Sequence, residues 1–213
     1  MKTYHKIQTI YKRNPETKFK TLLEGDFSLP EFEYLKNNYW IFTEKVDGTN
    51  IRIMFDGETI KFNGKTDNAQ LHADLIQRLS NIFSSQFNLF KDSFVAPEGE
   101  QTAVCFYGEG YGAGIQKGGC YKQNKDFVLF DIKIGDWWLQ RKDIEEIALK
   151  FGIDIVPIVG EGTLLDAVQE THVGMTSTWG NFIMEGLVLR PKTELKTRNG
   201  KRIITKIKHK DFN

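Results

Sequence analysis

Residues 42–50 read FTEKVDGTN, and this stretch decides the fold because it joins two strand-like runs through a tight turn. Residues 39–42 are apolar or aromatic before it, and apolar side chains alternate along residues 51–55 after it, which is the period of a half-buried strand. Asp47-Gly48 is a turn sequence, and it explains Lys45 as a solvated charge nearby. The alternative is that Lys45 is a reactive amine, and the remaining motifs have to distinguish the two.

Composition describes an ordinary globular chain with an uneven charge distribution. A chain of 213 residues is long enough to form a buried core. Its net charge is +1, so the protein as a whole is not a polycation. Between residues 190 and 210, however, nine lysines and arginines stand against Glu194 as the single acid. We therefore expect a phosphate-bearing partner near this end of the chain.

The cysteines and the N-terminus indicate a cellular compartment. Cys105 and Cys120 form no Cys-x-x-Cys pair and the four histidines are scattered, so we expect neither a structural zinc site nor a disulfide. The first residues lack the apolar core of a signal peptide, and no later run has the apolar length needed to cross a bilayer. A reduced, cytoplasmic protein is the expectation.

Periodicity and turn residues predict the other elements. Asp56-Gly57 indicates a hairpin, Gly152 ends a helix, and the glycine-rich residues 108–119, with Gly110 and Gly112, are expected to form a loop. That loop lacks the spacing and helix of a dinucleotide fingerprint. The expected strands are 39–42, 51–55, 59–62, 103–107, 127–132, 137–139, 185–190 and 202–208, and the expected helices are 70–83, 142–151 and 163–170. This order predicts a single α+β domain with antiparallel sheets flanked by two or three helices.

Six motifs follow one another along most of the chain after residue 40. They are EKVDGTN (44–50), GKTD (64–67), FYGEGYGAGIQKGG (106–119), DFVLFDI (126–132), MEGLVLRP (184–191) and RIITKIKHKDF (202–212). Each has an ordinary explanation when it stands alone, for example a solvated loop acid for Glu109. Together and in this order, they closely resemble the nucleotidyltransferase domain of the RNA ligase 2 family, which is related to DNA ligases and messenger-RNA capping enzymes. GIQK (114–117) and the late KDF (210–212) resemble RNA ligases in particular.

The resemblance implies an ATP-grasp-like nucleotidyltransferase domain and a covalent reaction at Lys45. In such enzymes, the lysine amine attacks the α-phosphorus of ATP, expels pyrophosphate and holds AMP as a phosphoramidate. A free lysine is almost wholly protonated at neutral pH. Lys206, Lys208 and a bound Mg²⁺ or Mn²⁺ are expected to favour the neutral amine and to neutralise charge on the phosphate. Lys206 and Lys208 are alternate residues of one strand, so both should face the same phosphate.

The same resemblance assigns the nucleotide-binding residues. Glu44 is expected at the adenine amino group, and Phe130 is expected to stack on the base. Asn50, Glu109 and Glu185 would surround the sugar and the hydrated metal, with Glu109 and Glu185 as the metal-binding carboxylates. Lys65 stands where the family usually has an arginine for the ribose and the substrate phosphate, and Gly48 would admit the nucleotide close to the backbone.

Three residues depart from the pattern of the RNA ligase 2 family: lysine at position 65, Arg190 where a lysine is common, and Asp47 where some relatives have histidine. The printed chain also stops directly after the last motif, and on this ground we expect residues 1–213 to form one catalytic domain without a C-terminal accessory domain.

The expected function is ATP-dependent joining of 5′-phosphate and 3′-hydroxyl RNA ends, at nicks or breaks, as in RNA repair. The alternatives are a small ATP-dependent DNA ligase, a capping enzyme that uses GTP, and a non-catalytic nucleotide-binding or RNA-binding relative.

Overall fold

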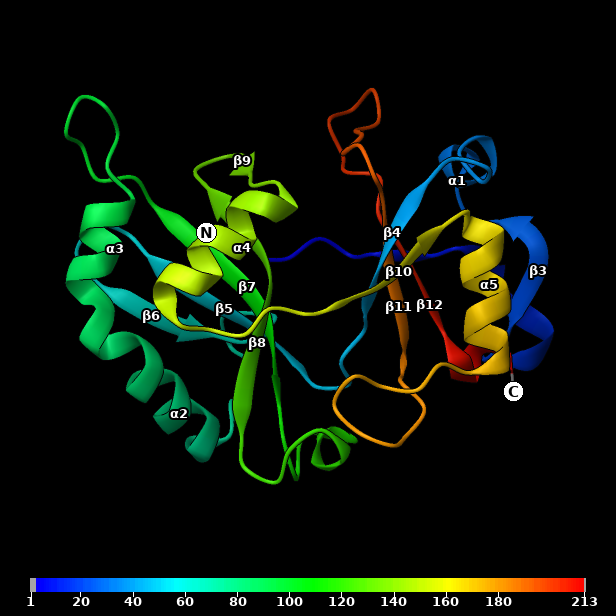
Figure 1. Ribbon diagram of the computed structural model, residues 1–213, viewed down its shortest axis with the longest axis horizontal. Helices are drawn as coiled ribbons and strands as arrows, with labels where there is room; N and C mark the ends of the chain where they lie inside the picture. The colour runs from blue at the N-terminus through cyan, green and yellow to red at the C-terminus, as the bar shows by residue number, and fades with distance from the viewer. Residues whose placement is uncertain (1–2, 213) are drawn as a thin grey trace. The chain divides into compact units, whose positions relative to one another are not determined.

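The computed structural model describes residues 3–212, which form two compact units. The first unit consists of residues 3–4 and Asp47–Val156, and the second consists of His5–Val46 and residues 157–212. Each unit has its own five-stranded sheet and its own apolar core. Figure 1 shows the helices that cover each sheet.

The first unit is an antiparallel sheet with helices on one face. Its strand order is β6-β5-β7-β8-β9. The strands are β5 (Thr49–Phe55), β6 (Ile60–Asn63), β7 (Val104–Tyr111), β8 (Asp126–Ile134) and β9 (Trp137–Trp138), and the helices are α2 (Ala73–Phe83), α3 (Phe87–Ser93) and α4 (Arg141–Phe151). Apolar side chains of all three helices, among them Leu79, Phe90 and Phe151, pack against Ile53 and Phe106 of the sheet. The opposite face of the sheet is therefore left for polar and aromatic side chains.

The second unit contains the N-terminal and C-terminal segments of the chain. Its main sheet has the order β1-β12-β11-β4-β10, and β2 and β3 form a separate two-stranded ribbon. The pairing of β1 with β12 is parallel, and the other neighbours are antiparallel. The elements are β1 (Gln8–Thr9), β2 (Tyr11–Arg13), β3 (Leu22–Phe27), α1 (Pro30–Tyr34), β4 (Trp40–Glu44), β10 (Ile158–Gly162), α5 (Leu164–Val173), β11 (Gly186–Pro191) and β12 (Thr205–Lys208). Trp40, Phe42, Leu187 and Ile207 are fully buried in its core.

Short 3-10 helices complete the fold at Pro15–Thr17, Ser84–Gln86, Gly118–Cys120 and His209–Asp211. Within residues 3–212, no helix combines the length and apolar character that crossing a membrane requires.

The predicted α+β class with antiparallel sheets and few helices is confirmed. The helix predicted to end at Gly152 does so, and this glycine has φ 62°, the left-handed conformation of a helix C-cap. The elements of residues 5–38, α3 and β10 were not predicted, because they are short and lack a clear apolar period. That residues 1–213 act as one catalytic domain stays a prediction.

The predicted glycine-rich loop was wrong for its first residues, because β7 continues through Gly108 and Gly110 to Tyr111. A Cβ on Gly108 would lie 2.3 Å from the ring of Phe127, and one on Gly110 would lie 2.6 Å from Leu75 Cδ2. The glycines therefore let side chains of β8 and α2 pack directly on the strand.

The predicted last strand also began too early. The ladder of β12 starts at Thr205 rather than at residue 202. Arg202 forms only an isolated bridge with Lys196, and its guanidinium lies 2.6 Å from Glu194 Oε1. This ion pair fixes Arg202 in the preceding loop instead of in the sheet.

Candidate functional site

Two lysines share one buried carboxylate in the second unit. Lys45 Nζ lies 2.5 Å from Glu185 Oε2, and Lys208 Nζ lies 2.5 Å from Glu185 Oε1. The Glu185 side chain is 9% exposed, whereas those of Lys45 and Lys208 are 21% and 18% exposed. Burial raises the pKa of Glu185, but the two ammonium groups outweigh it and hold that pKa below its usual range. The carboxylate is therefore ionised and positions both lysine heads.

Three neighbouring strands bring these residues together. Lys45 directly follows β4, Glu185 directly precedes β11, and Lys208 ends β12. The backbone N–H of Lys45 donates to the carbonyl of Gly186 at 2.9 Å, and Gly186 is the register partner of Lys208. Strand pairing thus sets the separation of the three side chains before their ion pairs form.

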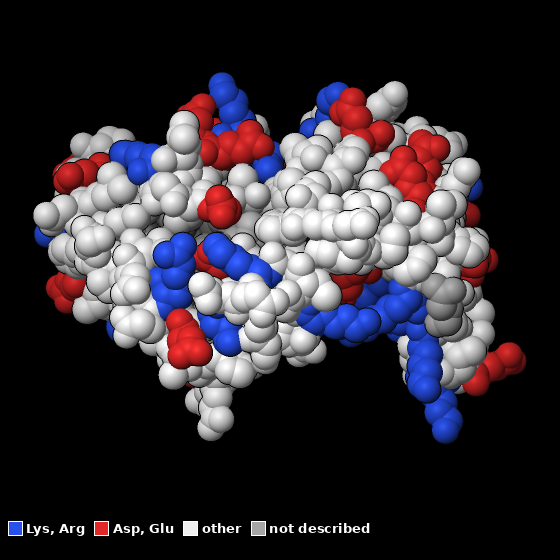
Figure 2. All heavy atoms as spheres, turned by 60° about the horizontal axis from the view of Figure 1, so that its bottom comes forward, with Lys and Arg blue, Asp and Glu red and all other residues white. Residues whose placement is uncertain are grey.

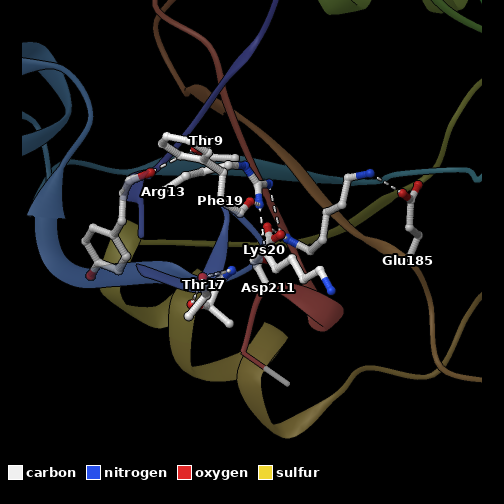
Figure 3. Close-up of polar contacts among 10 residues, drawn as sticks. Thr9, Arg13, Thr17, Phe19, Lys20, Glu185 and Asp211 are labelled. Carbon is white, nitrogen blue, oxygen red and sulfur yellow. Dashed lines mark hydrogen bonds and ion pairs between the residues drawn. The ribbon is translucent and has the colours of Figure 1, made fainter. Parts of the chain in front are cut away.

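Lys206 lies on the same face of β12 as Lys208, as the alternation predicts. The alternate residues Thr205 and Ile207 are fully buried, whereas both lysines are half-buried. Burial, with the positive charges of Lys208 and Lys45, lowers the pKa of Lys206 to about 8. Figure 3 shows Glu185 beside a neighbouring lysine and the Arg13–Asp211 contact in the same unit.

Glu44 is engaged within the second unit. Its carboxylate accepts hydrogen bonds from the Ser177 hydroxyl at 2.6 Å and from the Thr178 hydroxyl and backbone N–H at 3.0 Å each. Glu44 is 1% exposed, so these bonds offset the cost of burying the charge. A contact between Glu44 and an adenine amino group stays a prediction. For that contact, the adenine amino group would have to use a lone pair of the carboxylate that these three donors leave free, or displace one of the donors.

Asn50 and Glu109 lie opposite each other on β5 and β7 of the first unit. Their neighbours Ile51 and Ile53 point into the core below the helices, so Asn50 lies on the other face of the sheet. Asn50 Oδ1 is buried without a hydrogen-bond partner among residues 3–212. A ligand that donates a hydrogen bond, such as a ribose hydroxyl, would satisfy this oxygen.

Phe130 lies at a β-bulge, where the register between β7 and β8 shifts after Tyr107. Phe130 and its neighbour Asp131 consequently both reach Tyr4: the two rings are 5.0 Å apart, edge to face, and the Tyr4 hydroxyl donates to Asp131 Oδ2 at 2.7 Å. Bulges re-aim side chains next to active sites. Stacking of Phe130 on a base stays a prediction.

Arg52 is a residue that the sequence patterns did not single out. It is fully buried; its Nε donates to the Gly64 carbonyl at 2.9 Å and its Nη2 lies 2.6 Å from Asp67 Oδ1. Arg52 therefore fixes both ends of the turn that carries the exposed Lys65. In the sequence, Arg52 is the polar residue between two apolar ones of an alternating strand, and this pattern predicts a solvated side chain instead of a buried one.

Gly48 has a structural explanation of its own in the first unit. A Cβ there would lie 2.3 Å from the carbonyl oxygen of Gly110. Its absence of a side chain therefore follows from packing against β7, and the expected approach of a nucleotide stays a prediction.

The predicted metal ligands Glu109 and Glu185 belong to different units, and no three His, Cys, Asp or Glu residues gather as a metal site within residues 3–212. Mg²⁺ nevertheless binds proteins through one or two carboxylates, together with waters and substrate phosphates. Glu109 fits that role by its chemistry. The oxygens of Glu185 are occupied by the two ammonium groups, so Glu185 does not fit a metal in this arrangement.

Comparisons with known proteins agree with this fold. The sequence model of the RNA ligase family matches residues 38–208, which include every predicted site residue. No curated protein is significantly similar in sequence.

Solved structures of Naegleria gruberi RNA ligase are similar in fold. A variant with ATP and Mn is 18% identical with a TM-score of 0.64, and the match covers 84% of this chain and 52% of that one. An apo variant is 17% identical with a TM-score of 0.63, and the match covers 100% of this chain and 58% of that one. The enzyme with PPi is 17% identical with a TM-score of 0.64, and the match covers 98% of this chain and 58% of that one. This chain thus spans a little over half the length of these relatives.

Proposed function

Because the chain belongs to the RNA ligase family, we propose that it is an ATP-dependent RNA ligase that joins 5′-phosphate and 3′-hydroxyl ends through AMP bound covalently to Lys45. The observation that supports this most is the shared carboxylate: Glu185 holds Lys45 Nζ and Lys208 Nζ at 2.5 Å each. A solvated turn lysine, the ordinary explanation of Lys45, has no reason to be held this way.

Lys45 is the nucleophile of the proposed first step. Its Nζ loses a proton and attacks the α-phosphorus of ATP, an N–P bond forms, and the bond from the α-phosphorus to pyrophosphate breaks. Glu185, whose Oε2 lies 2.5 Å from Nζ, orients the amine, and the released proton passes to solvent. Lys206 and Lys208 supply positive charge for the phosphate oxygens as pyrophosphate leaves.

The roles in nucleotide binding are part of the same proposal. Glu44 and Phe130 would contact the base, Asn50 the sugar, and Lys65 a substrate phosphate. A bound Mg²⁺ or Mn²⁺ would neutralise charge on the triphosphate, and Glu109 is its proposed ligand. The unsatisfied Oδ1 of Asn50 supports this assignment, because a buried acceptor without a donor is costly.

In the second and third steps, AMP would pass from Lys45 to the 5′-phosphate of an RNA strand, and a 3′-hydroxyl would then displace it. The proposal names RNA ends or a nicked RNA duplex as the substrate and RNA repair as the setting.

Incubation with α-labelled ATP and Mg²⁺, followed by a denaturing gel, tests the first step. We expect acid-labile label on the wild type and none on Lys45→Ala. Lys142→Ala is the matched control, because that side chain is 84% exposed and its nearest carboxylate is 3.9 Å away. Label on Lys45→Ala would refute the proposal, and absence of label on the wild type would favour a non-catalytic binding protein.

Two further arms identify the substrates. Label from GTP instead of ATP would indicate a capping enzyme. Nicked duplexes that differ only in an RNA or a DNA 3′-hydroxyl strand separate an RNA ligase from a small DNA ligase.

A further inference from the structure

A basic hollow of about 350 Å³ lies in the second unit, on the N-terminal side of Lys206. We call it the N-terminal hollow, and its charged and aromatic lining consists of Lys6, Lys12, Arg13, Phe19 and Lys206. It exists because β1 pairs in parallel with β12, so that Thr9 is the register partner of Lys206. Only Lys206 of these five lies within the residues that match the family, 38–208.

The lining carries more positive than negative charge. Lys12 pairs with Asp26 at 2.6 Å, but both side chains are about half exposed, so this pair is weak. The backbone carbonyl of Lys206 accepts from the N–H of Ile10 at 3.1 Å, but its side-chain ammonium has no hydrogen-bond or ion-pair partner within residues 3–212. On the face that Figure 2 presents, lysine and arginine side chains gather over part of this unit. A phosphate group is the ligand that such an unpaired, half-buried ammonium suits.

Phe19 adds an aromatic surface to this charge. The residue is 61% exposed, and both Phe19 and Lys18 have positive φ, at 61° and 54°. Two successive non-glycine residues in the left-handed region are costly, so the surrounding structure has to hold them there.

Arg13 provides that support. Its Nη1 donates to the carbonyl oxygens of Phe19 at 3.2 Å and Lys20 at 3.3 Å, while its Nη2 lies 2.9 Å from Asp211, as Figure 3 shows. Asp211 in turn accepts from the backbone N–H of Lys208 at 3.1 Å. Arg13 is therefore a positioning residue that fastens the Phe19 loop to the end of β12.

We propose that the N-terminal hollow binds a single-stranded segment of RNA, with its phosphates on Lys6, Lys12 and Lys206 and an unpaired base stacked on Phe19. This inference rests on the proposed function, since the hollow shares Lys206 with the lysine cluster, by which we mean Lys45, Lys206 and Lys208. Exposed aromatic rings beside cations are how proteins hold single strands without reading their sequence. The aromatic ring favours a nucleic acid strand over a free polyphosphate, which offers nothing to stack.

Fluorescence anisotropy tests the hollow on the full chain carrying Lys45→Ala, without ATP, so that no reaction proceeds. The probe is a 12-nucleotide single-stranded RNA with a 5′ fluorophore. For Lys6→Ala/Lys12→Ala we expect Kd to rise about tenfold at low salt, and the slope of log Kd against log salt to fall by about one. The control removes two exposed lysines of α4 instead, Lys142→Ala/Lys150→Ala, and should bind like the parent.

The stacking part of the proposal has its own variants. Phe19→Ala should weaken binding about tenfold with an unchanged salt slope, and Phe19→Trp should restore it. Tyr34→Ala is the aromatic control, because Tyr34 is 86% exposed elsewhere in the unit. A fully paired duplex of the same strand should bind with the same affinity to Phe19→Ala and to the parent.

Two results would overturn the proposal. One is an equal Kd for single-stranded RNA in the hollow variants and in the controls. The other is a loss of inorganic pyrophosphate binding in Lys6→Ala/Lys12→Ala with RNA binding intact, which would make the hollow a pyrophosphate site. Both results are independent of the labelling assay. If Lys45 of the wild type is labelled by ATP but the hollow variants bind RNA as the controls do, the proposed function stands and only this inference is removed.

Discussion

Replacement of Glu185 by glutamine tests the lysine cluster most directly. The change keeps the shape of the side chain but removes its charge, and the new amide NH₂ would face one ammonium group at the present 2.5 Å contact. A charge pair about 4 Å apart is worth about 4 kcal/mol at an effective dielectric constant of about 20, and loss of one partner of a buried pair costs about 3–5 kcal/mol. Because Lys45 and Lys208 are each about one fifth exposed, water recovers part of this. We expect Glu185→Gln to lower the free energy of unfolding by about 2–3 kcal/mol.

Urea unfolding followed by circular dichroism measures this loss, and a double-mutant cycle with Lys45→Met assigns it. If Glu185 acts by holding Lys45, the double variant should lose at least about 1 kcal/mol less than the sum of the single variants. Glu185→Gln should also reduce the labelling of Lys45 by ATP. A change below about 0.5 kcal/mol, or fully additive variants, would refute the reasoning that the carboxylate positions the lysine.

Three further changes test other parts of the structure. Gly108→Ala should destabilise the protein by about 2–4 kcal/mol in urea unfolding, because its Cβ would lie 2.3 Å from the Phe127 ring. The control Gly119→Ala, whose Cβ would have its nearest contact at 3.4 Å, should cost under about 1 kcal/mol. Equal effects of the two variants would contradict the packing argument. Arg52→Lys should weaken the joining of RNA ends more than the labelling by ATP, because it releases the turn that carries the substrate-phosphate lysine; an equal loss of both would point to general unfolding. For Lys206, whose folded pKa is about 8 against an ordinary value of 10.5, the unfolded chain binds more protons between these values. The unfolding free energy of the wild type should therefore rise relative to Lys206→Met from pH 8 to pH 10, and a fall or a flat difference would contradict the lowered pKa.

The candidate site was predictable from the sequence as a set of residues more than as a geometry. Lys45 was expected at the end of a strand, and the alternation of β12 was expected to place Lys206 and Lys208 on one face, and both expectations agree with the structure. The buried position of Arg52 was not predicted from the sequence. Strand alternation predicts a solvated side chain there, and it contains no information about the turn that covers Arg52.

Local chemistry explains what the sequence by itself determined: the strand and turn around Lys45, the alternation of β12, and the helix that ends at Gly152. These depend on backbone preferences and apolar periods over a few neighbouring residues. Only the tertiary structure decided that Glu185, 140 positions from Lys45, holds that lysine, and that the N-terminal strand lies beside Lys206. Such contacts arise from the pairing of distant strands and from side-chain packing between them, and no local pattern encodes which partners will meet.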